Sequence, residues 1–102
     1  MFIVVQTQGG DVVIGLDEPD DFSRFDIQIL DVSEDEARKS LERIAVLQSE
    51  HAFVDPAALF SLPGARPENA DWVNQFELMT DYARSKGWVD ESGRIRAHVV
   101  RT

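Results

Sequence analysis

The sequence has no cysteine, only two histidines and no apolar run long enough to cross a membrane. The lack of cysteine excludes disulfides and thiolate chemistry. A bilayer span needs about 20 consecutive apolar residues. We therefore expect a soluble, cytoplasmic protein with no membrane partner.

Basic side chains are also scarce. The chain carries 10 Lys and Arg against 19 Asp and Glu, a net charge of −9. Acidic chains repel phosphate backbones, so no nucleic-acid partner is expected. A basic partner would be attracted, although acidity can also serve solubility alone.

Catalytic motifs are missing as well. The sequence contains no Gly-x-Ser-x-Gly nucleophile elbow and no glycine-rich phosphate loop. His51 and His98 have no partner at metal-ligand spacing. The acidic stretch 17–21 does not fit a calcium loop and is interpreted as a solvated turn. We predict no catalytic residue, no cofactor and no metal site, and an enzyme is the less favoured interpretation.

The 102 residues form one domain in which 43% of the residues are hydrophobic. The stretch 69–100 has the clearest pattern. Asn69 is a candidate N-cap and Gly87 a candidate stop for a helix. Four side chains at helical spacing form its apolar stripe, namely Trp72, Phe76, Met79 and Ala83. After this helix stop, the sequence is typical of a short hairpin whose two arms are residues 88–89 and 94–100.

Residues 2–7 and 12–16 flank Gly9 and Gly10, a typical two-residue hairpin turn. The expected register pairs Ile3 with Leu16 and Val5 with Ile14. The opposite face also carries apolar residues, namely Phe2, Val4 and Val13. In an antiparallel hairpin with one solvent-exposed face, apolar and polar residues should alternate along each strand. Since both faces here carry apolar residues, either helices or another chain should cover this second face. These three residues form the candidate interface.

The remaining elements are predicted as a third strand over 25–29, a helix over 33–50 opened by a Ser33/Glu36 capping box, and a short helix near 56–60. The order is β-β-β-α-(short α)-α-β-β. We expect an α+β fold with an antiparallel sheet of four to five strands and the two main helices on one sheet face.

One basic group stands out near the end of the acidic chain: Arg94, Arg96, His98 and Arg101. These residues can pair with carboxylates on a neighbouring strand, for example Asp26, or form a site for an anion or an acidic partner. Both interpretations stay open.

Three functions are consistent with this sequence. The first is a protein interaction module, similar in size and charge to bacterial inhibitor or immunity proteins, that binds a partner or itself through the N-terminal hairpin. The second is a small oligomeric enzyme or ligand-binding protein with an inter-subunit pocket near Tyr82, Arg96 and His98. The third and least favoured is a winged-helix nucleic-acid binder, because the candidate recognition helix carries Asp71, Glu77 and Asp81.

Overall fold

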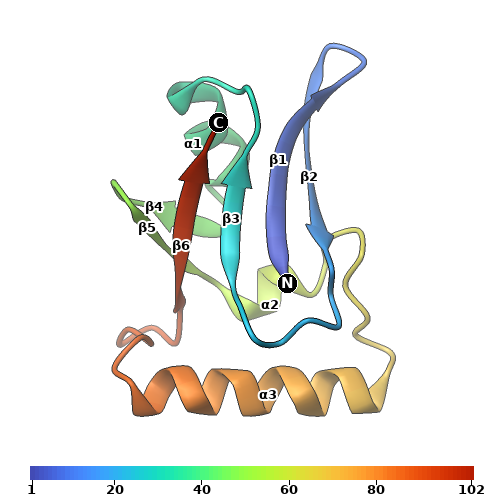
Figure 1. Ribbon diagram of the computed structural model, residues 1–102, viewed down its shortest axis with the longest axis vertical. Coiled ribbons are helices and arrows are strands. Elements are labelled where there is room, and N and C mark those ends of the chain that lie inside the picture. The colour runs from blue at the N-terminus through green and yellow to red at the C-terminus, as the bar shows by residue number, and fades with distance from the viewer.

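The computed structural model describes all 102 residues and contains a six-stranded sheet and three helices. The strands are β1 (Phe2–Gln8), β2 (Asp11–Asp17), β3 (Asp26–Ile29), β4 (Ala45–Leu47), β5 (His51–Val54) and β6 (Ile95–Arg101). The helices are α1 (Glu34–Leu41), α2 (Pro56–Leu59) and α3 (Ala70–Ser85). The sheet order is β2-β1-β3-β6-β5-β4, and the sheet curls into a half-barrel (Figure 1).

The predicted antiparallel sheet of four to five strands is wrong. β3 runs parallel to both β1 and β6, while the β1–β2, β5–β6 and β4–β5 pairs are antiparallel. The sheet is therefore mixed. The reason is that residues 18–25 carry the chain back across the lower end of β1, so that β3 starts beside the start of β1 (Figure 1). The alternation of apolar and polar residues along a strand predicts which face each side chain lies on, but it does not predict which strands pair with it.

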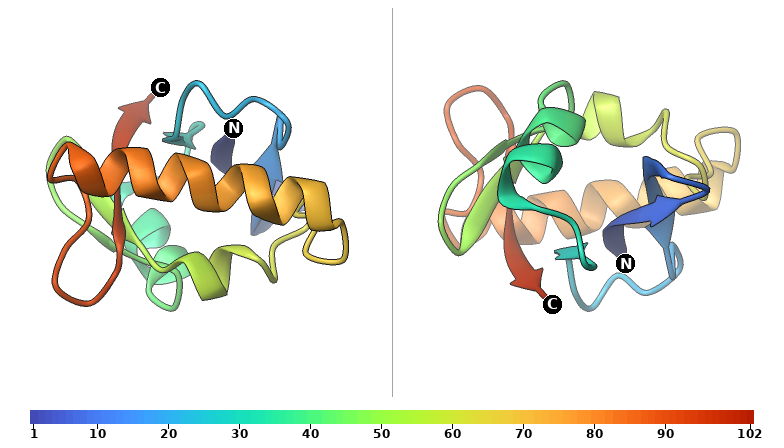
Figure 2. Two further views of the ribbon diagram at one scale, coloured as in Figure 1. Left: turned by 90° about the horizontal axis from the view of Figure 1, so that it is seen from below. Right: turned by 90° about the horizontal axis from the view of Figure 1, so that it is seen from above.

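The helices do not pack together on one sheet face as predicted. α1 contacts both edge strands, β2 and β4, and so fills the opening of the half-barrel. α3 runs across the lower end, roughly perpendicular to the front strands (Figure 1). Seen from below and above, α3 covers one end of the curl while α1 and α2 lie behind β1, β3 and β6 (Figure 2).

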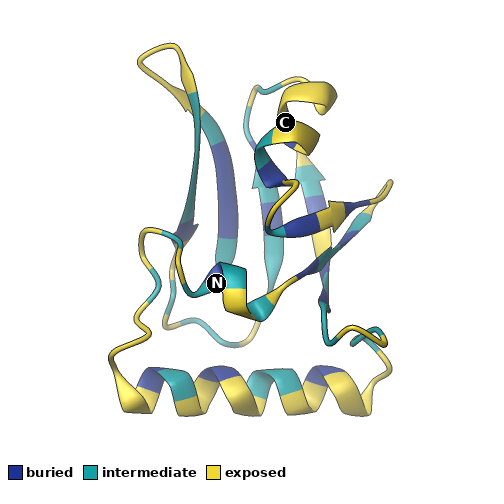
Figure 3. Cartoon of the chain, turned by 180° about the vertical axis from the view of Figure 1, so that it is seen from behind, coloured by how far each residue is buried: buried dark blue, intermediate teal, exposed yellow.

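The core lies inside the curl. Ile3, Val5, Ile27 and Ile29 are fully or nearly fully buried on the strands, and no buried residue is polar or charged. In the view from behind, β1 is buried over much of its length, buried positions recur on the side of α3 that faces the strands, and the β1–β2 turn is exposed (Figure 3). Trp72, Phe76 and Ala83 of the predicted stripe are buried, and Met79 is partly so.

The outer face of β1, β3 and β6 carries no helix. It faces the viewer in Figure 1 and lies opposite α1 in the view from above in Figure 2. Residues 18–25 border it at its lower end (Figure 1). This open face holds the outward residues of the N-terminal hairpin and of β6.

Candidate functional site

The candidate interface residues lie on the open face at alternate positions of β1 and β2. Val4 is 8% exposed, whereas Phe2 and Val13 are half-buried. The guanidinium carbon of Arg24 lies 5.1 Å from the centre of the Phe2 ring, and Arg24 Nε donates to Asp26 Oδ2 at 2.8 Å. Side chains and a loop therefore cover part of this face, and no helix does.

A hollow of about 300 Å³ opens on the same face, beside Val4. Gly15, the β2 residue opposite Val4, leaves it open because it has no side chain. Pro63 and Gly64 form its outer edge, where Pro63 O accepts a 2.7 Å hydrogen bond from Leu16 N. Asp17 and Gln6 add polar groups at the rim. The arrangement can receive one apolar side chain from outside, with a carboxylate beside it.

The structure separates the predicted basic group. The Arg101 guanidinium binds both carboxylate oxygens of Glu34, at 2.9 and 2.7 Å. Arg94 lines a different small pocket, together with Glu42 and Asp55. Only Arg96 and His98 stay together, on the open face. β6 does lie beside β3, with His98 opposite Asp26 as the pairing hypothesis required, but the ion pair of Asp26 is with Arg24.

Arg96 and His98 join three further residues in a shallow pocket of about 170 Å³, lined by Phe25, His51, Trp88, Arg96 and His98. The His51 and His98 rings meet edge to face with centres 5.8 Å apart, and the Arg96 guanidinium lies 5.4 Å from the Trp88 ring centre. We call this the histidine pocket.

Sequence reasoning missed His51 because the residue directly follows the predicted helix over 33–50 and was given no strand. The useful signal was the alternation in 51–54, where Ala52 and Val54 are buried and His51 and Phe53 are half-buried. Tyr82, also proposed for a pocket with Arg96 and His98, does not line the histidine pocket. Its ring contacts Trp88 with centres 6.1 Å apart, and its side chain is 58% exposed.

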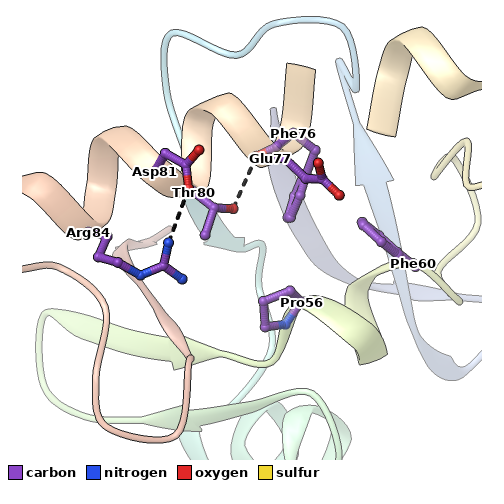
Figure 4. Close-up of a pocket in the computed structure, with 7 residues that line it drawn as sticks. All are labelled: Pro56, Phe60, Phe76, Glu77, Thr80, Asp81 and Arg84. Atoms are coloured by element: carbon purple, nitrogen blue, oxygen red, sulfur yellow. Dashed lines mark hydrogen bonds and ion pairs between the residues drawn. The ribbon is translucent and has the colours of Figure 1, made fainter. Parts of the chain in front are cut away.

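The largest cavity, about 320 Å³, lies between α2 and α3 (Figure 4). Phe60 and Phe76 form its apolar wall, with ring centres 5.0 Å apart. Its polar groups largely satisfy one another, since Arg84 donates to Asp81 at 3.1 Å and the Thr80 hydroxyl donates to Phe76 O. Apart from Glu77, the charged side chains that line this cavity are paired with each other.

The ionisable groups with shifted pKa values are surface side chains and the partly buried amino terminus. The Arg101 hydrogen bond lowers the pKa of Glu34, and hydrogen bonds from Ser23 lower the pKa of Asp21. Partial burial lowers the pKa of the Met1 amino group, which donates to Asp21 O and Arg24 O. None of these groups lines one of the four pockets, whereas acid–base sites pair desolvation with a specific charge in a cleft. No group of three or more His, Asp or Glu side chains is placed to hold a metal ion.

Comparisons with protein families, with curated proteins and with solved structures found no match to this chain. None of its helices combines the length and the hydrophobicity that crossing a bilayer demands. Function must therefore be argued from the two surface sites.

Proposed function

We propose that this chain is a non-catalytic interaction protein whose open sheet face receives, over β1 and β2, a basic segment of another protein. The observation that carries the proposal is the hollow at Gly15, on a sheet face that no helix covers. An apolar side chain of the partner would enter the hollow beside Val4. The cytoplasmic setting expected from the sequence belongs to the same proposal.

Charge supports a basic partner. Residues 1–23, which include β1 and β2, carry five carboxylate side chains and no basic one. A surface of one sign attracts the opposite sign and speeds the encounter. Asp17 places one of these carboxylates at the rim of the hollow.

A second copy of the chain is a poorer occupant. Each copy carries a net charge of −9, and the open face is the outside of a curled sheet. Two convex surfaces touch over a small area, while a specific interface buries roughly 1,600 Å². A partner with a concave surface or an extended segment fits this face better.

The first experiment locates the partner. A photoreactive benzophenone amino acid is placed at Val13 in the open face and, as the control, at Val46. Val46 is a 44% exposed valine on the opposite edge strand of the sheet. We expect a cross-linked product at position 13 that is absent at position 46, and the captured protein should have a basic surface. A product that is only a dimer of this chain would contradict the proposal.

The second experiment titrates the purified partner against variants. Gly15→Leu should fill the hollow and weaken binding about tenfold or more, a loss of roughly 1.4 kcal/mol. Val13→Lys should weaken binding more than Val13→Glu, because the partner is basic, and Val46→Lys should have no effect. Added salt should weaken the wild-type complex. Equal affinities for the wild type and Gly15→Leu would overturn the proposal.

A further inference from the structure

We propose that the histidine pocket binds a small organic anion, a carboxylate or phosphate group on a planar or apolar body, and binds it more tightly as His51 and His98 take up protons. The site lies on β5 and β6, away from the hollow at Gly15. It is independent of the proposed partner and can fail or succeed without it.

Arg96 provides the first argument. Five arginines of this chain form ion pairs, namely Arg24, Arg38, Arg66, Arg84 and Arg101. Arg96 is not among them, although acids outnumber bases 19 to 10. Its guanidinium lies against Trp88, which holds it at the pocket and leaves its N–H donors without a carboxylate. Such a planar donor group suits carboxylate and phosphate oxygens.

The two histidines provide the second argument. They are the only histidines in the chain, and adjacent strands bring them opposite each other in register. Neither imidazole makes a hydrogen bond within the protein. Imidazole is the side chain best suited to change its charge in the physiological pH range. Two neighbouring imidazolium rings repel, so an anion between them and Arg96 would stabilise the doubly protonated state.

The neighbouring charges agree with an anion. His98 faces Asp26 of β3, whose carboxylate is occupied by Arg24 at 2.8 Å from Nε. Glu50 precedes His51, and its charge acts on Arg101. No third ligand stands with the two imidazoles to hold a metal ion, and Arg96 would repel one.

The walls determine the kind of anion. Phe25 and Trp88 are aromatic and close two sides of the site. The volume of about 170 Å³ is well above the roughly 10–15 Å³ that a cavity needs to hold one water, so the pocket has room for more than a bare inorganic ion. Aromatic walls with one cluster of donors favour a ligand with an apolar or planar body and a single charged end.

The test follows the imidazole C–H signals of His51 and His98 by NMR, since no other histidine contributes. The probes are benzoate, phenyl phosphate and inorganic phosphate. We expect saturable shifts with the two organic probes, with affinity at about pH 5.5 roughly tenfold higher than at about pH 7.5. Inorganic phosphate should bind more weakly, because it lacks the body that contacts Phe25 and Trp88.

Variants assign the roles. Arg96→Gln should weaken binding at least about tenfold at both pH values. The matched control is Arg94→Gln, two residues earlier on the chain, which should leave affinity unchanged. His51→Gln and His98→Gln should reduce the pH dependence and retain part of the binding at about pH 7.5 through Arg96. Amide spectra of each variant verify that the fold is kept.

The proposal is overturned if neither organic probe gives saturable shifts at about pH 5.5. It is also overturned if affinity is equal at the two pH values, or if Arg94→Gln is as damaging as Arg96→Gln. Zinc binding to the histidines at neutral pH, without anion binding at acidic pH, would instead identify the pair as a cation site.

Discussion

At the scale of single residues, Gly64 is the position with the least freedom. It has a positive φ of 96°, and a Cβ there would lie 2.1 Å from Leu16 O. Gly10, in the β1–β2 turn, also has a positive φ of 87°, but a Cβ there would meet nothing within 4 Å. The two glycines therefore have similar φ values and differ in the room that a side chain would have.

This contrast gives a prediction. Gly10→Ala should lower the free energy of unfolding by about 1 kcal/mol, because the backbone conformation disfavours a side chain. Gly64→Ala should lower it by at least about 2 kcal/mol more, because the connector between α2 and α3 (residues 60–69) must also move away from the edge of β2. Urea unfolding of both variants measures the difference. Equal losses would mean that the connector shifts freely.

Local residue signals predicted local structure well. Gly87 takes a positive φ of 78°, Trp88 N donates to Ala83 O at 2.9 Å, and Gly87 N donates to Arg84 O at 3.1 Å, as the predicted helix stop requires. The Ser33 side chain accepts from Glu36 N at 3.2 Å. The register of the N-terminal hairpin, with Ile3 opposite Leu16, is confirmed. Each of these features depends on residues close in sequence.

At the scale of elements, the predicted helix over 33–50 is wrong beyond its first two turns. The helix α1 ends at Leu41, and residues 45–47 and 51–54 form a hairpin instead. Ala45 and Leu47 are buried around the exposed Val46, which is a period of two. The hairpin gains backbone pairing with β6, a partner about 45 residues away that no local pattern reveals.

The predicted C-terminal hairpin is also reduced. Its first arm contributes one isolated bridge, Val89 to Ile95, while its second arm becomes the central strand β6. A winged-helix interpretation depended on this hairpin as a separate wing, so that alternative loses its structural basis. β6 instead brings together Arg96, His98 and His51.

The ion pair between Glu34 of α1 and Arg101 of β6 gives an element-scale prediction. Since the pair lowers the pKa of Glu34, it stabilises the folded protein above the ordinary carboxyl value of 4.5 and is lost as pH falls through the lower folded value. Both side chains are more than one-third exposed, so Glu34→Gln should cost less than about 1 kcal/mol at neutral pH. The cost should vanish on acidification.

Unfolding by urea at several pH values measures this effect. Asp35→Asn is the control, because Asp35 shares the first turn of α1 and has no ion pair. It should lose only the helix-dipole contribution, a few tenths of a kcal/mol. If Glu34→Gln and Asp35→Asn behave alike at every pH, the pair contributes nothing beyond the dipole.

At the scale of the whole molecule, the sequence could not predict the neighbours of β3 and β6 or the curl of the sheet. These follow from pairings between distant segments. The histidine pocket depends on the same pairings, since Phe25, His51 and His98 come from three strands or their ends. The candidate interface was accessible from sequence because Phe2, Val4 and Val13 lie in one local hairpin.

The net charge of −9 and the open face together determine how copies of the chain interact. At neutral pH, repulsion between copies should keep the protein monomeric. Near the isoelectric point of about 4.5 this repulsion disappears, and half-buried apolar residues of the open face remain available. We therefore predict weak, reversible association near that pH, measured by sedimentation velocity.

Val13→Lys and Val46→Lys add the same charge, so charge alone would reduce association equally in both. If the open face is the contact, Val13→Lys should reduce association more, because only this lysine lies on β2 opposite Gln6, which lines the hollow at Gly15.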